Sequence, residues 1–390
     1  MILAKIFHKW FQTWIKECND TALLNPQNYI ATNTEMLFRD YFFRYIKSLN
    51  GSARSRTYSS TVRTASHIID GLGNYKMSEI NKTVLKEFIN GFTKKTYTKN
   101  KQKGPEYYSQ SEIDKVFHLL HAAIIEASSE DGDHFLRTDF MANIKIPRSN
   151  RFESEYCALT DDEIRMLTNI VSENEMINVW ILLMLYTGVR PSEALALKFS
   201  DIDYERKTVS IMRTLSYEDN IDPITLKRRG PRKAIITSLK NERGKNQINY
   251  QKRTLKVGDK ILEVLQQWES IVKSDKELMK MKKDKGTEEY IFSGSKGQLW
   301  LYDDYKQVYK RLLKKHGLSI SQYNPYRFRH NCCTRLFRLG INLKAVQLIM
   351  GDNTPDMVMR VYANLDKSDV LKGSQDYSDS LDIALGIVNN

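Results

Sequence analysis

The stretch YRFRH at residues 326–330 is a basic cluster that sets Arg329 at the entrance of a predicted helix over 329–339. Upstream, TGVRPSE at residues 187–193 sets Arg190 at the entrance of another helix, because glycine commonly ends one helix and proline favours the first position of the next. An isolated tyrosine, Tyr362, follows the basic cluster. Two arginines can clamp one phosphate and a tyrosine hydroxyl can attack it. The combination predicts cleavage of a phosphodiester through a covalent phosphotyrosine.

The charge of the chain points to a polyanionic partner. Sixty Lys and Arg residues against 47 Asp and Glu residues give the 390-residue chain a net charge of +13. An excess of this size favours a polyanion such as nucleic acid, although a basic surface also keeps many proteins soluble. The length suits two or three domains.

The cysteines and the apolar runs indicate the compartment. The four cysteines (Cys18, Cys157, Cys332 and Cys333) have neither zinc-site spacing nor the pattern of a disulfide framework, so we expect no metal and a reducing cytosol. Residues 1–17 lack the apolar core of a signal peptide, and the most apolar run, residues 179–186, is too short for a membrane span. The sequence therefore predicts a soluble cytoplasmic protein, associated with the nucleoid through DNA and not with a membrane.

The fold class predicted from the hydrophobic periodicity is mainly α with a small antiparallel β-sheet. Residues 1–31 form a short helical segment, residues 32–150 an all-α bundle of four helices, and residues 151–390 a mixed α/β domain that ends in a tail helix over 380–388. The second domain opens with a capping box, Thr160 to Glu163. Runs of β-branched residues predict strands at 208–211 and 234–237, with basic hairpins between and beyond them.

Two basic segments of the predicted bundle are candidates for contact with DNA phosphates. Residues 94–103 lack apolar periodicity, and residues 147–151 are predicted to be a linker that could lie along a duplex. A solvated loop is the alternative for the first segment. The side chains concerned are Lys94, Lys95, Lys99, Lys101, Lys103, Arg148 and Arg151.

The predicted chemistry needs three kinds of group. Arginines neutralise the charge that grows on the equatorial phosphate oxygens in the transition state. The tyrosine has an ordinary pKa near 10, so it needs an electropositive site to lose its proton as it attacks. The leaving 5′ oxygen needs a proton, which a lysine on a flexible hairpin could donate.

The two arginine motifs resemble those of the tyrosine recombinases, the phage-integrase family. The resemblance covers residues 187–197 and then 327–362, and more weakly the helical residues 33–150 resemble the core-binding domain of that family. It implies that Arg190 and Arg329 bind the scissile phosphate and that Tyr362 attacks it. It also implies that Lys240 protonates the leaving group, with Lys245 as a competitor, that His330 supports the site, and that no metal or other cofactor is used.

Two positions depart from the family pattern. Tyr326 stands where the family usually has histidine, and a phenol can donate a hydrogen bond but cannot act as an acid–base group at neutral pH. Asp352 stands where histidine or tryptophan is common. A carboxylate there would repel a phosphate by about 1–4 kcal/mol at 4 Å, unless it turns away or pairs with an arginine.

The resemblance implies a site-specific recombinase or integrase of a mobile genetic element. Such an enzyme holds two DNA segments in a homotetramer and exchanges strands through 3′-phosphotyrosine links, and a directionality factor is a possible further partner. The alternatives are a catalytically weakened or inactive DNA-binding relative and an enzyme like a type IB topoisomerase. The tail helix would dock on its own domain or on a neighbouring protomer.

Overall fold

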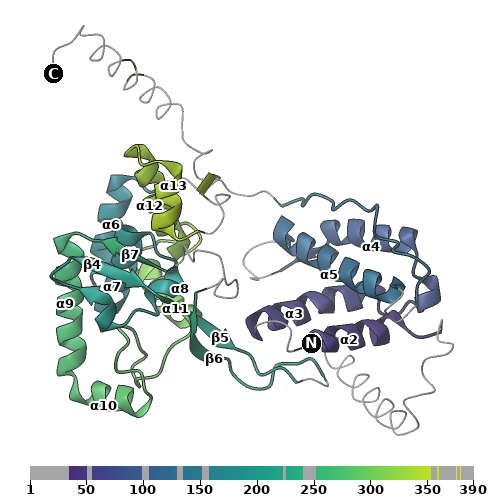
Figure 1. The fold of residues 1–390 in the computed structure, drawn as a ribbon, viewed down its shortest axis with the longest axis horizontal. Helices are drawn as coiled ribbons and strands as arrows, with labels where there is room; N and C mark the ends of the chain where they lie inside the picture. Colours follow the sequence, from purple (N-terminus) through teal and green to yellow (C-terminus); the bar gives the residue numbers. More distant parts are fainter. Residues whose placement is uncertain are drawn as a thin grey trace. The chain divides into compact units, whose positions relative to one another are not determined.

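The computed structural model describes residues 35–50, 55–98, 105–129, 135–151, 158–222, 225–239, 252–352, 358–359, 375 and 378. Two compact units divide the chain, one within Met1–Glu153 and Ile221–Arg229 and one within Ser154–Asn220 and Gly230–Asn390. Figure 1 shows helices throughout both units and strands within the second. The predicted segments 1–31 and 380–388 lie outside the described residues.

The first unit is a bundle of helices, as the periodicity predicted. Its helices are α2 (Phe38–Ser48), α3 (Ser55–Leu72), the short 3₁₀ helix η2 (Met77–Glu79), α4 (Lys82–Lys94) and α5 (Gln110–Ser128). Each longer helix turns one apolar face inward, and Phe38, Phe42, Ile68 and Leu120 are fully buried in the shared core. Side chains of Asn81 and Ser109 cap the first turns of α4 and α5.

A small hairpin replaces part of the loop that the sequence predicted over residues 94–103. Strand β1 (Thr96–Tyr97) pairs with β2 (Glu106–Tyr107) in antiparallel register. The Tyr97 ring lies 4.9 Å from that of Tyr108, which stacks on Phe92 at 4.6 Å. This aromatic packing orders a polar segment whose sequence has no strand-like alternation.

The segment predicted as a linker is attached to the helical unit at its start. The backbone N–H of Ser149 donates to Gln110 Oε1 at 2.8 Å, and the Ser149 hydroxyl donates to the Tyr108 carbonyl at 2.5 Å. These bonds fix residues 147–151 against α5 and β2, so this part of the connection is ordered by the bundle.

The second unit is built around one buried helix. Its helices are α6 (Asp161–Val171), α7 (Glu175–Thr187), α8 (Pro191–Ala194), η3 (Phe199–Asp201), α9 (Asp259–Ser274), α10 (Lys276–Asp284), α11 (Tyr302–Lys315), α12 (Pro325–Arg338) and α13 (Leu343–Met350). Helix α7 is apolar on nearly every side and packs against α6, α9, α11 and α12. Trp180 in its centre is fully buried and donates its indole N–H to the Pro191 carbonyl at 3.1 Å, which ties α7 to α8.

The strands of the second unit form two small antiparallel sheets, where the sequence predicted one antiparallel sheet. Strands β3 (Ile202–Asp203), β4 (Thr208–Ile211) and β7 (Arg253–Lys256) form one sheet in the order β3-β4-β7, and β5 (Arg213–Glu218) pairs with β6 (Lys233–Ser238) in the other. The predicted strands correspond to β4 and β6. The sequence analysis missed β5 and β7, because both alternate polar residues with few apolar ones.

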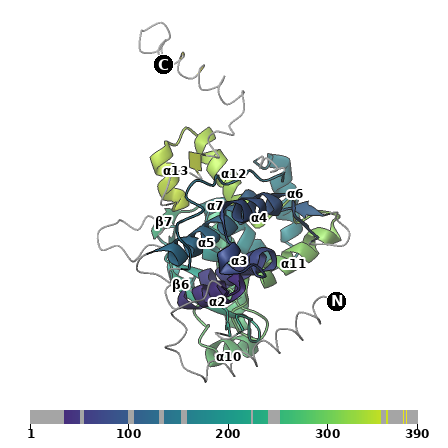
Figure 2. The ribbon, with the colours of Figure 1, turned by 90° about the vertical axis from the view of Figure 1, so that its right-hand side faces the viewer.

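The start of α12 differs from the sequence prediction. We expected a helix from Arg329, but α12 begins at Pro325, where the Asn324 side chain accepts the Tyr326 N–H and proline occupies the first helical position. Arg329 is thus one turn inside the helix and not at its entrance. Figure 2 shows α12 beside α13, which Asn342 caps and Gly351 ends as predicted.

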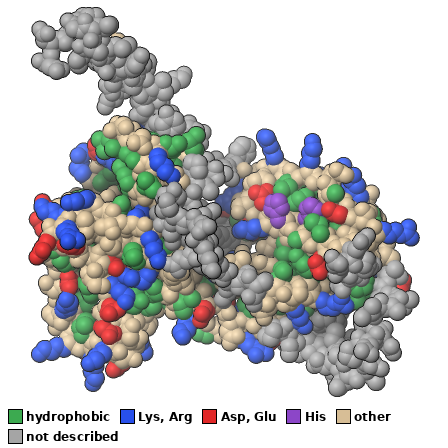
Figure 3. Space-filling view, viewed as in Figure 1, with side chains coloured by type: hydrophobic (Ala, Val, Ile, Leu, Met, Phe, Trp, Pro, Cys, Tyr) green, Lys and Arg blue, Asp and Glu red, His purple; other side chains and the backbone are tan. Residues whose placement is uncertain are grey.

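The surface carries both signs of charge. Figure 3 shows lysine and arginine side chains spread over both units with acidic side chains between them. Among the residues that the structure describes, none of the helices has the length and apolar character needed to cross a membrane.

Gly188 offers a direct test of how the end of α7 is held. We expect Gly188→Ala to destabilise the second unit by about 2–5 kcal/mol, the sum of left-handed strain and overpacking. Its φ is +62°, and an added Cβ would lie 2.8 Å from Met350 Sδ and 2.9 Å from Cys332 Sγ. Urea denaturation of the full chain measures the change.

Gly340→Ala is the matched control for this substitution. Gly340 also follows a helix and has φ +75°, but an added Cβ there meets no atom within 4 Å. It should therefore show only the strain, about 1–2 kcal/mol. Equal losses for the two variants would contradict the close packing of Gly188 against α12 and α13.

Candidate active site

Arg190 lies where the chain passes from α7 to α8. Gly188 ends α7 in the left-handed conformation, and Arg190 is the extended residue that precedes α8. Its Nη1 donates to Glu193 Oε1 at 2.6 Å, and both Nη atoms donate to the Gly351 carbonyl at 3.1 Å. Its Nη2 also pairs with Asp352. The side chain keeps 28% of its surface exposed, so one edge can still meet a ligand.

Arg329 reaches the same place from α12. Its Nη1 donates to the Gly188 carbonyl at 2.6 Å, and its Nη2 donates to both carboxylate oxygens of Asp352 at 2.9 Å. Only 2% of the side chain is exposed. Burial and the neighbouring Arg190 charge lower the pKa of Arg329 to about 10, which still leaves the guanidinium charged at neutral pH. The structure therefore brings together the two arginines that the sequence singled out.

Asp352 lies between these arginines. Its carboxylate is 8% exposed and accepts hydrogen bonds from Arg190 and Arg329. The Gln347 side chain donates to the Asp352 carbonyl at 2.9 Å, and the Asp352 N–H donates back to the Gln347 carbonyl at 3.1 Å. Of the two outcomes that the sequence left open, pairing with an arginine is the one observed, and it involves both arginines.

Two further charged residues complete the group, and the sequence analysis did not assign either of them. Glu193 is 1% exposed, and its Oε2 accepts from the Arg190 backbone N–H at 3.1 Å and from Arg253 Nη2 at 2.9 Å. Arg253, in β7, is 6% exposed. The spacing Arg190–Glu193 is that of a capping box, which could have revealed Glu193. Arg253 stands among many basic residues, and nothing in the sequence separates it from them.

Together these five residues form the arginine cluster: Arg190, Glu193, Arg253, Arg329 and Asp352. Its three guanidinium groups and two carboxylates leave one net positive charge in a largely buried place. Guanidinium groups donate paired hydrogen bonds to phosphate oxygens, and Arg190 keeps an exposed edge. The cluster is therefore suited to an anion such as a phosphodiester.

Two residues of α12 beside Arg329 were also candidates. Burial and the adjacent Arg329 charge lower the pKa of His330, so this imidazole is neutral at pH 7. Tyr326 is 43% exposed, one turn before Arg329. The residue is therefore accessible to a ligand at the surface.

Several other candidates lie outside the described residues or on the surface. Six of them are outside the described residues: Tyr362, Lys240, Lys245, Lys99, Lys101 and Lys103. Lys94, Lys95 and Arg148 are exposed. Arg151 is also exposed and lies 3.5 Å from both Glu106 and the Tyr97 hydroxyl.

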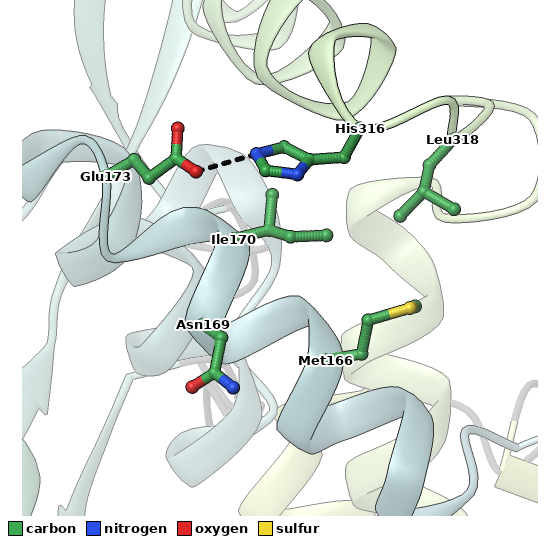
Figure 4. A pocket seen from close by; sticks show the side chains of 6 residues that line it. All are labelled: Met166, Asn169, Ile170, Glu173, His316 and Leu318. Carbon is green, nitrogen blue, oxygen red and sulfur yellow. Dashed lines mark hydrogen bonds and ion pairs between the residues drawn. The ribbon is translucent and has the colours of Figure 1, made fainter.

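A pocket elsewhere in the second unit is unrelated to the arginine cluster. It has a volume of about 400 Å³ and is lined by Met166, Asn169, Ile170, Glu173, His316 and Leu318, as Figure 4 shows. Glu173 accepts from His316 at 2.7 Å and from Lys315 at 2.6 Å, so its polar groups pair with each other. Within the described part of the chain, no group of three or more His, Cys, Asp or Glu side chains could hold a metal ion.

Comparison with known families identifies the class of protein. The phage integrase family matches residues 158–369, more than half of the chain, and the phage integrase N-terminal SAM-like domain matches residues 37–93. The chain belongs to the phage integrase family, the tyrosine recombinases. The arginine cluster lies within the first match.

Individual relatives agree with this assignment. A tyrosine recombinase XerC-like protein of Caldanaerobacter subterraneus subsp. tengcongensis is 24% identical over 219 residues, which cover 55% of this chain and 52% of the relative. The transposase from transposon Tn916 of Enterococcus faecalis is 25% identical over 235 residues, which cover 56% and 53%. The chain thus spans about half the length of the curated relatives it matches.

Solved structures share the fold. The Tn1549 transposon integrase in complex with transposon right end DNA has a TM-score of 0.64 at 19% identity, covering 88% of this chain and 100% of that one. The lambda integrase tetramer bound to a Holliday junction has a TM-score of 0.53 at 17% identity, covering 84% and 77%. The predicted fold class, mainly α with small antiparallel sheets, is confirmed.

Glu193 gives the cluster a measurable pH dependence. Burial alone would raise the pKa of Glu193, but Arg253 and Arg190 outweigh it and hold that pKa below 4.5. Its contribution to stability is therefore complete above pH 4.5 and is lost as the pH falls below 4.5 through the lowered pKa. We expect Glu193→Gln to cost about 3–5 kcal/mol at pH 7 and progressively less in acid, as measured by urea denaturation.

Glu289→Gln provides the comparison. Glu289 also has a pKa lowered by an ion pair, with Lys198, but it is exposed, so its loss should change stability little at any pH. A penalty for Glu193→Gln that stays constant down to strong acid would show that charge on Glu193 does not hold the cluster together.

Proposed function

We propose that the chain is a site-specific DNA recombinase of a mobile genetic element, which cuts and rejoins DNA through a 3′-phosphotyrosine intermediate. The convergence of Arg190 and Arg329 on one carboxylate supports it most strongly. The two guanidinium groups come from elements far apart in the sequence and bind a single anionic group, which is the arrangement that a scissile phosphate needs. The names of two relatives, a tyrosine recombinase XerC-like protein and the transposase from transposon Tn916, agree with this function.

The proposed reaction exchanges one phosphodiester for another. Arg190 and Arg329 hold the non-bridging oxygens of the scissile phosphate, and the Tyr362 hydroxyl attacks phosphorus and releases its proton to solvent. A bond forms between the tyrosine oxygen and phosphorus, and the bond from phosphorus to the 5′ oxygen breaks. The 5′ oxygen takes a proton from Lys240 or Lys245 and leaves as a hydroxyl. Attack by the 5′ hydroxyl of a second strand reverses these steps and releases the tyrosine, so no high-energy cofactor is consumed.

Two neighbouring side chains, His330 and Tyr326, would support the reaction by hydrogen bonding and would not transfer the proton to the leaving 5′ oxygen. His330 is neutral and half-buried beside Arg329, which suits a hydrogen-bonding support of the site. Tyr326 is exposed enough to donate a hydrogen bond to a phosphate oxygen. Most of the family has a histidine at this position. A phenol can donate a hydrogen bond but does not replace the imidazole of a histidine as an acid–base group.

The proposed partners follow from the same chemistry. Double-stranded DNA at attachment sites is the substrate, and the exposed Lys94, Lys95, Arg148 and Arg151 are available to its phosphates. Exchange between two duplexes needs four strands to be cut, which a homotetramer on DNA would provide. The lambda integrase structure, a tetramer on a Holliday junction, supports this assembly. A directionality factor would decide between integration and excision. In a cell such a protein would be found on the nucleoid.

One observation favours a second function. In the structure Asp352 pairs with both arginines, as would suit a DNA-binding relative that does not cleave. A topoisomerase of type IB would share the covalent step but relax supercoils without strand exchange.

The nucleophile is tested by trapping the covalent intermediate. We expect the wild-type chain to form a protein–DNA adduct with nicked suicide duplexes that carry candidate crossover sites, and Tyr362→Phe to form none, because only the phenolic oxygen can join to phosphorus. Denaturing gels with labelled DNA measure the adduct.

Tyr326→Phe is the matched control and should keep the adduct at a reduced rate. An adduct that survives Tyr362→Phe would assign the attack to another tyrosine, with Tyr377 the next to test. DNA binding without any adduct on a verified site would favour the non-cleaving relative.

Asp352 offers a gain-of-function test. A carboxylate near 4 Å from the phosphate opposes binding by about 1–4 kcal/mol, so Asp352→Asn should speed adduct formation by about fivefold or more. The same change removes the counter-ion shared by two arginines and should lower thermal stability. Single-turnover cleavage and thermal denaturation measure the two effects. A cleavage rate that falls with the stability would show instead that the carboxylate assists the reaction.

A further inference from the structure

Arg253 contacts both structures that orient Arg190. Its Nη2 donates to Glu193 Oε2 at 2.9 Å, and its Nε donates to the Ile349 carbonyl at 2.7 Å. The first partner belongs to α8 and the second to the end of α13. Strand β7, which carries Arg253, is thereby joined to both elements by one guanidinium group.

The contact with the end of α13 is close. An ideal Cβ on Gly351 would lie 2.4 Å from Arg253 Nη1 and 2.7 Å from its Cζ, so only glycine leaves room for the guanidinium plane. Gly351 also has φ +66°, which favours glycine by itself. The backbone turn at 349–352 is thus shaped around the Arg253 side chain.

Arg253 and Arg190 share one carboxylate and approach the same backbone turn. Glu193 Oε1 accepts from Arg190 Nη1 at 2.6 Å, while Glu193 Oε2 accepts from Arg253. The Gly351 carbonyl accepts from both Nη atoms of Arg190, while Arg253 packs against the Gly351 backbone. Of the three acceptors of the Arg190 guanidinium, Arg253 therefore contacts Glu193 directly and packs against the residue that supplies the Gly351 carbonyl, while Asp352 is the third.

We infer that Arg253 is a positioning residue that sets the direction of Arg190 toward the scissile phosphate. It acts through Glu193, which accepts from its Nη2, and through the backbone turn that carries the Gly351 carbonyl, where its Nε donates to the Ile349 carbonyl. This inference rests on the proposed function, in which Arg190 holds the phosphate. Displacement of a group by about 1 Å is enough to slow catalysis about 100-fold.

A lysine in place of Arg253 would show whether the positive charge of this side chain or its hydrogen-bond geometry matters. It keeps the positive charge beside Glu193, but its donors lie on a single nitrogen. Arg253 uses Nε for the Ile349 carbonyl and Nη2 for Glu193, two directions that one ammonium group cannot reproduce. Arg253→Lys is therefore expected to fold and to bind DNA but to leave Arg190 poorly oriented.

The first measurement needs no DNA. Phenylglyoxal modifies accessible arginines, and mass spectrometry of the full chain gives the labelling rate of Arg190. We expect Arg253→Lys to raise that rate, because Arg190 loses the alignment of its acceptors. Arg213→Lys is the matched control. Arg213 is 25% exposed, pairs with Asp201 in the same unit and takes no part in the arginine cluster, so this change should leave Arg190 labelling as in the wild type.

The second measurement is a double-mutant cycle on cleavage of a nicked suicide duplex. Arg253→Lys should slow single-turnover cleavage about 100-fold in the wild-type background. It should slow Arg190→Lys far less, since the orientation it controls has already been lost. Arg213→Lys should have the same small effect in both backgrounds.

The outcomes separate the two hypotheses. Unchanged labelling of Arg190 in Arg253→Lys overturns the inference, whatever the DNA does. Equal slowing by Arg253→Lys in both backgrounds also overturns it and leaves Arg253 as an independent contributor to stability. If the wild type forms no adduct, the proposed function fails, and the labelling experiment still decides whether Arg253 orients Arg190.

Discussion

The second unit depends on a shared set of ion pairs in which two carboxylates hold three arginines in a largely buried place. Arg329 is nearly inaccessible to solvent and would be strongly destabilising without a partner. Asp352 and Glu193 supply the opposing charge, and the backbone carbonyls of Gly188, Ile349 and Gly351 accept further hydrogen bonds. The carbonyls of Gly188 and Gly351 belong to glycines in the left-handed conformation at the ends of helices. The conformation of these helix ends is therefore part of how the arginines are satisfied.

This arrangement explains why distant segments must meet. The groups involved come from the start of α8, from β7, from α12 and from the turn after α13. Helix α8 has only four residues, so apolar packing alone gives it little direction. The apolar core around α7 brings the segments near one another, and the ion pairs then fix their orientation. Apolar burial is non-directional, whereas bidentate hydrogen bonds are strongly directional.

The sequence revealed the arginines because their local signals are strong. Glycine and proline around Arg190 define a helix boundary, and the structure has one there. The same reasoning failed for Arg329, since the Asn324 cap and Pro325 start the helix one turn earlier. Arg253 could not be found, because its role depends on a pairing between strands and on the shape of Gly351, neither of which has a local signature. Local rules identify where a helix begins or ends, but not which of several basic residues becomes buried.

Asp352 illustrates how a departure from a family pattern can be compatible with its chemistry. The arginine cluster has a net charge of +1 with Asp352 in place, so a phosphodiester can bind and bring the total to zero. A carboxylate and a phosphate both present oxygen acceptors to a guanidinium, so the two compete for the same N–H groups of Arg190 and Arg329. In the proposed function, the carboxylate pairs with the arginines while no DNA is bound, and the phosphate must then displace it from them. Histidine or tryptophan at this position would impose no such competition, but it would also leave Arg329 without its buried counter-ion.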